Sequence, residues 1–161
     1  MKIGITGHQR FDDSSVVPWV EGCIRARLNE FTKLTGLSSL AKGSDQIFAR
    51  VVLNLGGELE AIVPFPGYEA MFEDARDAAS FRELRAQCAA VTTLEFMDTK
   101  EQSYLLAGEY ISDHSDLLVA VWNGRPAAGL GGTADVVAYA LRHGRTVYQI
   151  NPVTHEAYDL V

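Results

Sequence analysis

A chain of 161 residues with 47% apolar and 22% charged residues has the composition of one globular domain, which excludes a disordered chain and a fibrous repeat. Its formal net charge of -7, from 14 basic and 21 acidic residues, argues against a protein that wraps a nucleic-acid backbone, because such proteins need a basic face. DNA and RNA are therefore not expected as partners. The lack of a signal-peptide pattern, of a CxxC motif and of an apolar run of roughly 18 residues predicts a cytoplasmic protein without a membrane partner.

Strand and helix patterns alternate along the chain. In chain order they predict a strand at residues 2–6, a helix at 16–31, a strand at 37–40, a helix at 44–55, a strand at 59–65, short helices at 68–74 and 81–88, a strand at 91–96, a helix at 102–113, a strand at 117–122, a helix at 133–143 and a strand at 146–150. Ser14 or Ser15 is expected as the N-cap of the first helix, and Ser44 as that of the second. No structure is predicted from residue 151 onward.

This alternation determines the expected architecture. Parallel strands need long crossover connections, which helices supply, and the uninterrupted apolar strand at 117–122 is typical of the covered middle of a sheet. We therefore predict an α/β fold, a Rossmann-like three-layer sandwich with a mostly parallel sheet of about six strands. Residues 1–161 are expected to form a single nucleotide-binding domain, because no linker, repeat or low-complexity segment divides them.

Unusual residues gather directly after the predicted strands. In open parallel sheets, ligands bind at the carboxyl ends of the strands, near the point where the strand order switches. GHQR follows the first strand, AKGSD the second and PFPGY the third, whereas Trp122 and GLGGTAD follow the fifth. The residues expected to bind a small phosphate-bearing ligand are Gly7, His8, Arg10, Lys42, Gly43, Ser44, Asp45, Pro64, Trp122, Gly131, Gly132 and Thr133.

The glycine-rich segment before the last helix is the best signal among these loops. Gly131, Gly132 and Thr133 stand where the free N–H groups and the positive end of a helix dipole face a bound anion. The alternative is a simple turn in which Thr133 only caps its helix. Arg10 is expected to pair with a phosphate and Lys42 to add a point charge there, unless both are solvated surface cations.

The remaining polar candidates each have two interpretations. His8 either donates to a phosphate or ribose hydroxyl or pairs with the backbone, and Asp45 either accepts from a ribose or stabilises a helix dipole. Asp135 is the best-placed carboxylate for a ribose or for acid–base work, unless it only stabilises its helix. Trp122 either stacks on a base or closes the core. Tyr68 and the acidic residues after it are considered as a rim or lid.

Several common site motifs are absent from the sequence. There is no GxGxxG after the first strand, no GxxxxGK[ST] and no GxSxG, which disfavours an ordinary dinucleotide dehydrogenase, a P-loop protein and a nucleophile-elbow hydrolase. His114, His143 and His155 show no metal-ligand spacing with Cys, Asp or Glu. We therefore expect no metal site, and no cofactor.

Four segments carry a resemblance to a known family. They are GITGHQR at 4–10, SLAKGSDQ at 39–46, SDLLVAVW at 115–122 and GGTADVV at 131–137. With these segments the chain resembles, over nearly its whole length, the SLOG superfamily, which joins the lonely-guy phosphoribohydrolases, the DNA-processing protein A family and the nucleotide-sensing domains of bacterial defence systems. The resemblance implies a Rossmann-like fold that binds nucleoside phosphates or their derivatives, commonly as a homodimer, with the Gly-Gly-Thr loop at the phosphate.

The sequence departs from the hydrolase branch of this superfamily at two positions. That branch resembles PGGxGTxxE, but Val136 stands at the position of its Glu, and the helix around 108–114 has no Arg. The first hypothesis is therefore a binding module, a sensor or carrier of a nucleotide-derived ligand. The alternative is an enzyme that cleaves the base–ribose bond of nucleoside monophosphates, with Asp135 and Arg10 as its catalytic residues. A third hypothesis is a fold retained for protein contacts alone.

Overall fold

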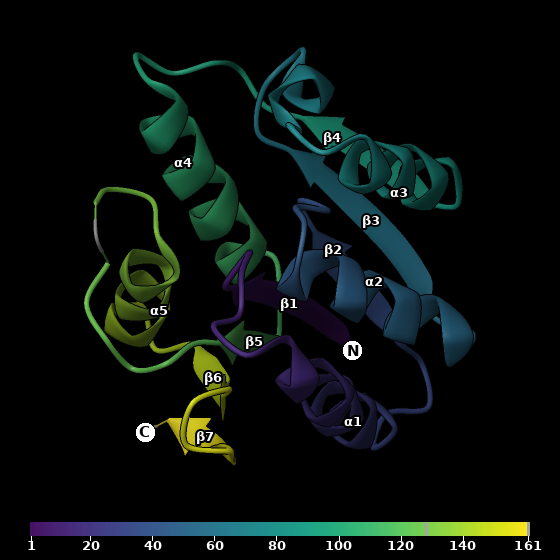
Figure 1. The fold of residues 1–161 in the computed structure, drawn as a ribbon, viewed down its shortest axis with the longest axis vertical. Coiled ribbons are helices and arrows are strands. Elements are labelled where there is room, and N and C mark those ends of the chain that lie inside the picture. The colour runs from purple at the N-terminus through teal and green to yellow at the C-terminus, as the bar shows by residue number, and fades with distance from the viewer. Residues whose placement is uncertain (128, 161) are drawn as a thin grey trace.

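The computed structural model describes residues 1–127 and 129–160, which form a seven-stranded sheet with helices on both faces (Figure 1). The strands are β1 (Lys2–Gly7), β2 (Thr35–Ser38), β3 (Glu58–Val63), β4 (Ala90–Thr93), β5 (Leu117–Val121), β6 (Thr146–Asn151) and β7 (Glu156–Leu160). The helices are α1 (Val17–Leu28), α2 (Ser44–Asn54), α3 (Ala75–Ala86), α4 (Lys100–Asp113) and α5 (Thr133–Arg142), with two short 3-10 helices, η1 (Ser14–Val16) and η2 (Tyr68–Met71).

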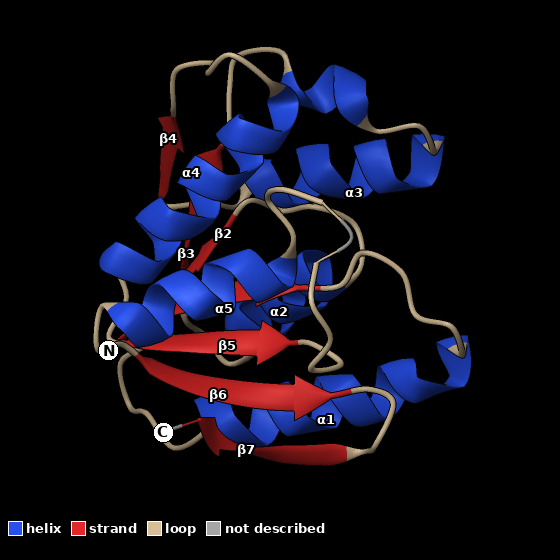
Figure 2. Ribbon diagram, turned by 90° about the vertical axis from the view of Figure 1, so that its left-hand side faces the viewer, coloured by secondary structure: helices blue, strands red, loops and turns tan. Residues whose placement is uncertain are grey.

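The strand order is β4-β3-β2-β1-β5-β6-β7, and every neighbouring pair except the last is parallel. Figure 2 shows β5 and β6 pointing the same way and β7 running back beside them. The predicted α/β class and the mostly parallel sheet are confirmed. The seventh strand lies in the segment for which no structure was predicted. It is an edge strand with exposed or half-buried side chains, so its sequence lacks the apolar alternation that identified the others.

Helices α1, α2 and α3 cover one face of the sheet, and α4 and α5 cover the other (Figure 1). The alternation of strand side chains produces this division. Ile3 and Ile5 of β1 pack with α1 and α2, whereas Leu118 and Ala120 of β5 pack with α4 and α5. Phe48 of α2 is fully buried among the residues that join α1 and α2 to the sheet. Both faces are therefore sealed, and the strand ends remain as the place for a site.

The predicted helix caps were wrong. Asp13 accepts the N–H of Ser15 at the start of η1, and α1 then continues from η1 with Val16 at its N-cap. The N-cap of α2 is Gly43, because the hydroxyl of Ser44 bonds to a different loop. Local sequence predicted the capping serines, but the neighbouring Asp13 caps η1 and a tertiary contact takes the hydroxyl of Ser44.

Within residues 1–127 and 129–160, no helix has both the length and the apolar character that a bilayer crossing requires.

Candidate functional site

The carboxyl ends of β1 and β5 form the switch point of the sheet. The chain continues from β1 toward β2 on one side and from β5 toward β6 on the other, and Gly7 is paired with Val121 where the two strands end. The N–H of His8 donates to the Val121 carbonyl at 3.0 Å. A cavity of about 780 Å³ opens here, within the range of roughly 300–1,000 Å³ that is usual for small-molecule sites.

Loops from four strands bring most of the predicted site residues to this cavity. Those that line it are Gly7, His8, Arg10, Lys42, Asp45, Pro64, Trp122, Gly131, Gly132 and Thr133. Gly43, Ser44 and Asp135 are not among the lining residues. The predicted ligand residues thus divide into a set that faces the cavity and a smaller set behind it.

Gly43 and Ser44 hold the loop after β2 against the loop after β1. The hydroxyl and the N–H of Ser44 both donate to the His8 carbonyl, at 2.7 and 3.1 Å. Gly43 has φ +79°, and a Cβ at this position would lie 2.5 Å from the Gln9 carbonyl oxygen. Only glycine fits both the left-handed backbone and the close approach. These two residues position Lys42 and Asp45 without facing the cavity.

The N-terminus of α5 is open toward the cavity. Its N-cap is Gly132, which makes no side-chain cap hydrogen bond. The N–H of the preceding Gly131 donates to Oδ2 of Asp135 at 3.0 Å. This bond makes Asp135 a brace of the glycine loop, whereas Gly132, Thr133 and Ala134 face the cavity at the positive end of the helix dipole.

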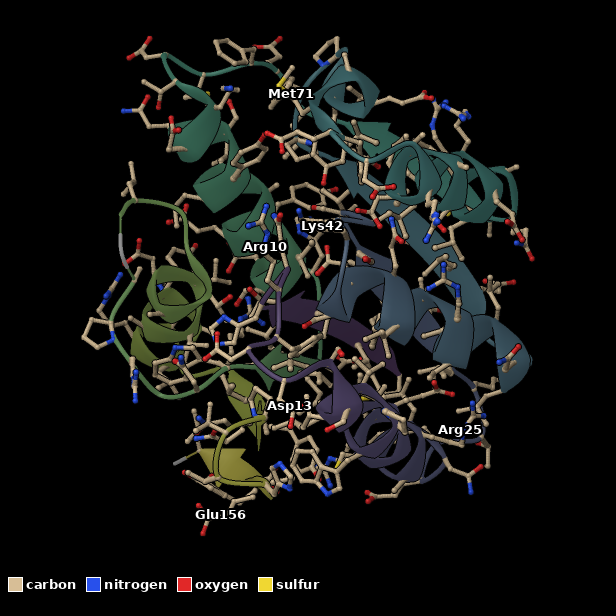
Figure 3. The ribbon with its side chains drawn as sticks, viewed as in Figure 1. Arg10, Asp13, Arg25, Lys42, Met71 and Glu156 are labelled. Atoms are coloured by element: carbon tan, nitrogen blue, oxygen red, sulfur yellow. The ribbon has the colours of Figure 1, made fainter. Side chains whose placement is uncertain are left out.

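Three cationic side chains line the cavity: Arg10, Lys42 and Arg125. Within the described residues, none of the three takes part in an ion pair. Figure 3 shows Arg10 and Lys42 close together between α4 and α2. Arg125 was not among the predicted residues, although it follows β5 in a loop that the sequence singled out. Unpaired cations beside an open helix N-terminus favour an anionic ligand.

His8 is fixed by the backbone of the neighbouring loop. The N–H of Asn123 donates to its Nε2 at 3.0 Å, so the neutral ring carries its proton on Nδ1. Burial lowers the pKa of His8 below 6.5, against smaller opposing effects of a hydrogen bond with the Asn123 side chain and of Asp12. The ring is therefore neutral at pH 7 and connects the loops after β1 and β5.

Asp45 is a buried carboxylate in the wall of the cavity, with 7% of the residue exposed. Burial raises its pKa to about 7, and hydrogen bonds from Ala41, Ser38 and Ser39 act in the opposite direction. The Ala41 N–H donates to Oδ2 at 3.3 Å. An acid with this position and pKa differs from an ordinary first-turn residue that only stabilises a helix dipole.

Aromatic side chains line the cavity beyond Trp122. The indole N–H of Trp122 donates to the Arg125 carbonyl at 2.8 Å, so this ring is tied to its own loop. Tyr68, Phe72 and Tyr104 also line the wall. Tyr104 belongs to α4 and was missed, because its helical spacing is that of an ordinary core residue; only the packing of α4 over the strand ends places it here.

No group of three or more His, Cys, Asp or Glu side chains in the described part of the chain could hold a metal ion.

Neither a family model nor a curated protein matches the sequence, whereas solved structures match the fold. DNA processing protein A from Streptococcus pneumoniae matches with a TM-score of 0.65 and 17% identity over 92% of this chain and 49% of the other. DNA processing protein A from Helicobacter pylori, whose structure is described for its single-stranded DNA binding mode, matches with a TM-score of 0.65 and 18% identity. The match covers 92% of this chain and 64% of the other. The molybdenum cofactor binding protein of Rippkaea orientalis matches with a TM-score of 0.58 and 16% identity, over 93% of this chain and 76% of the other.

These matches confirm the resemblance to the SLOG superfamily at the level of the fold. This chain spans about half of the Streptococcus protein and 64% of the Helicobacter protein.

The exclusion of nucleic acid as a partner was wrong. It rested on net charge, but the fold of this chain is shared with a protein that binds single-stranded DNA. Net charge is a sum over the whole surface and does not exclude phosphate contacts at one place on it, and three basic side chains, together with the acidic Asp45, Glu73 and Asp77, line the cavity of this chain of charge -7.

Proposed function

We propose that this chain is a binding module, a sensor or carrier that holds a nucleotide or a nucleotide-derived small molecule in the cavity at the ends of β1, β2, β3 and β5. One observation carries the proposal: Arg10, Lys42 and the N-terminus of α5 converge on one cavity. The phosphate of the ligand lies against Gly132 and Thr133, with Arg10 as a bidentate partner and Lys42 as a point charge.

The comparisons support a binding role in general terms. One matching structure is that of a molybdenum cofactor binding protein and another is described for its binding of single-stranded DNA, so this fold serves ligands of different size. In this chain the cations lie within a cavity of about 780 Å³, which favours a small molecule over a long strand. The single-domain organisation and the homodimer implied by the resemblance belong to the same proposal.

Cleavage of the base–ribose bond is the second candidate. It requires a carboxylate aimed at C1′ while water adds there and the base leaves. The Asp135 carboxylate instead accepts from the N–H of Gly131 and is not among the lining residues. Release of free base from a nucleoside monophosphate, abolished in Asp135→Asn, would establish this enzyme in place of the binding module.

A thermal-shift panel tests the binding module directly. The panel holds nucleoside mono-, di- and triphosphates, cyclic nucleotides, ADP-ribose and a single-stranded oligonucleotide. At ~100 times its dissociation constant, a ligand adds about 2.7 kcal/mol to the free energy of unfolding. Arg10→Ala is expected to weaken binding by about 1.5–3 kcal/mol, the usual scale of a charged hydrogen bond.

Arg25→Ala is the matched control, because Arg25 pairs with Glu21 on α1, away from the cavity (Figure 3). It should bind as the unmodified chain does. If no small nucleotide raises the midpoint and only the oligonucleotide does, the cavity proposal fails. Equal affinity of Arg10→Ala and the unmodified chain would remove Arg10 from the site.

A further inference from the structure

The charged residues that line the cavity change sign across the sheet. Those that follow β1 and β5 are basic, Arg10 and Arg125, whereas those that follow β3 are acidic, Glu73 and Asp77. Strand β3 lies two strands from β1, and adjacent strands lie roughly 4.8 Å apart, so about 10 Å separates the acidic end from Arg10. Figure 3 shows Met71, which also follows β3 and lines the cavity, on the β4 side of Arg10. The cavity is therefore polarised along the sheet.

The loop after β2 lies between the two ends and carries one group of each sign. Lys42 and Asp45 both line the cavity there. Asp45 already accepts hydrogen bonds from its own loop, and burial raises its pKa to about 7, so it is only partly ionised at neutral pH. The side-chain amide of Gln46 donates to the carbonyls of Leu40 and Asp77, both at 3.2 Å. This bridge fixes the first turn of α3 beside the loop after β2.

The four acids at residues 64–77 differ in whether they have partners. Glu69 pairs with Arg82 at 2.6 Å, and the Asp74 carboxylate caps α3 by accepting a backbone N–H; neither acid lines the cavity. Glu73 and Asp77 do line it, and their carboxylates have no ion pair and no hydrogen bond within the described residues. The N-terminus of a helix carries only about half a positive charge, which the capping Asp74 already meets. This end of the cavity therefore has an excess of negative charge.

Aromatic rings belong to the same end of the cavity. The ring centroid of Tyr68 lies 5.4 Å from that of Phe72 and 6.2 Å from that of Tyr104, and all three residues line the cavity. Tyr68 is only 6% exposed, and its hydroxyl has no hydrogen-bond partner within the described residues. Its oxygen is not sealed from solvent, so it opens on the cavity. A nearly buried hydroxyl gains from a ligand partner, because its loss of water is otherwise uncompensated.

We propose that the cavity takes a mononucleotide whose base is a positively charged planar ring, with this ring at the Tyr68 end and the phosphate at Arg10 and the N-terminus of α5. This inference rests on the proposed function and names the class of its ligand. Aromatic faces and the carboxylates of Glu73 and Asp77 both attract a cationic ring, whereas a neutral base gains from the aromatic faces alone. A phosphate at that end would meet two charges of its own sign, so the polarity also determines the direction in which the ligand lies.

A neutral base is the competing occupant of the aromatic end, because every base has a face that stacks on aromatic side chains. For such an occupant, removing a positive charge from the ring would not weaken binding. Nicotinamide mononucleotide and its reduced form separate the two cases. They share the ribose, the phosphate and the carboxamide, but the oxidised ring is a cation and the reduced ring is neutral.

Isothermal titration calorimetry at pH 8 would measure the affinity of both forms for the unmodified chain, the double variant Glu73→Gln/Asp77→Asn and Glu83→Gln. The oxidised form is expected to bind at least roughly 4-fold more tightly, from about 2- to 30-fold for a cation on an aromatic face and about 1.4- to 5-fold for each exposed charge pair. The double variant should lower this ratio by roughly 2- to 25-fold, because only the rings then distinguish the two forms. Glu83→Gln alters an exposed acid of α3 outside the cavity lining and should retain the ratio.

The two forms on the unmodified chain test the inference even if the double variant fails to fold. Equal affinities, or tighter binding of the reduced form, overturn it and leave the binding module standing. An unchanged ratio in a folded double variant also overturns it, because Glu73 and Asp77 then have no part in recognising the ring. If neither form binds but another nucleotide does, the inference fails and the proposed function stands. If no nucleotide binds, the proposed function itself fails.

Discussion

The buried carboxylate of Asp45 predicts an unusual dependence of stability on pH. Burial raises its pKa from 3.8 to about 7 in the folded chain. Each pKa unit corresponds to about 1.36 kcal/mol, so ionised Asp45 costs the folded state about 4 kcal/mol relative to the unfolded chain. Below pH 4 the group is protonated in both states and this cost is absent. The free energy of unfolding then falls as pH rises toward 7, because only the unfolded chain releases the proton.

Asp45→Asn keeps the shape of the side chain and removes its charge. At pH 8 the variant is expected to be more stable than the unmodified chain by up to about 4 kcal/mol, or by about 10 °C in midpoint, and at pH 4 the advantage should vanish. Urea unfolding at pH 4 to 8 measures the difference. Subtracting one protein from the other cancels the titration of His8, which occurs in the same window.

Asp98→Asn supplies the control, since this exposed acid should give a curve parallel to that of the unmodified chain. Tyr68 lines the same cavity as Asp45, but burial raises the pKa of its phenol, so it stays neutral throughout the series. Parallel curves for Asp45→Asn and the unmodified chain would refute the reasoning, because they would mean that the folded state carries the ionised carboxylate without cost.

Two further predictions concern the loops around the cavity. Gly131→Ala places a Cβ at φ +87° and 2.5 Å from the Glu101 carbonyl, so it should lower stability by at least about 1–2 kcal/mol and weaken nucleotide binding, whereas Gly22→Ala on α1, where a Cβ meets nothing within 4 Å, should raise stability by about 0.5–1 kcal/mol. Thermal unfolding of the two variants measures this contrast. Equal changes in stability would refute the argument that backbone strain at Gly131 destabilises its alanine variant. His8 should titrate below pH 6.5 in an NMR experiment on the unliganded protein, because burial disfavours its charged form. A midpoint above 6.5 would show that burial does not determine the charge of this ring.

Most of the fold was predictable because its signals are local. The apolar run of β5 and the alternation of strand and helix patterns specify a covered parallel sheet wherever they occur. The edge strand β7 was missed because exposure on both sides of a strand removes the pattern. The cap expected at Ser14 or Ser15 was misplaced because the carboxylate of Asp13, just before them, caps η1, and the cap expected at Ser44 was misplaced because its hydroxyl bonds to the distant His8 carbonyl.

The site too has features that the local sequence predicts and features that only tertiary contacts decide. Strand ends are identifiable in a sequence, so the loops that carry Gly7, Arg10, Lys42 and the glycine segment before α5 were predicted to meet, and the parallel sheet brings them together. Whether a residue within such a loop faces the cavity depends on backbone direction, which placed Ser44 and Asp135 behind it.

The sequence alone determined that this chain forms a mostly parallel α/β sheet with a glycine-rich loop before its last helix, because periodicity and glycine placement act over a few neighbouring residues. Only the tertiary structure decided that Asp45 is buried in the cavity wall, that Tyr104 of α4 lines the same cavity and that Arg10, Lys42 and Arg125 form no ion pair within the described residues. Burial and charge pairing are set by residues far apart in sequence, and no local pattern encodes them.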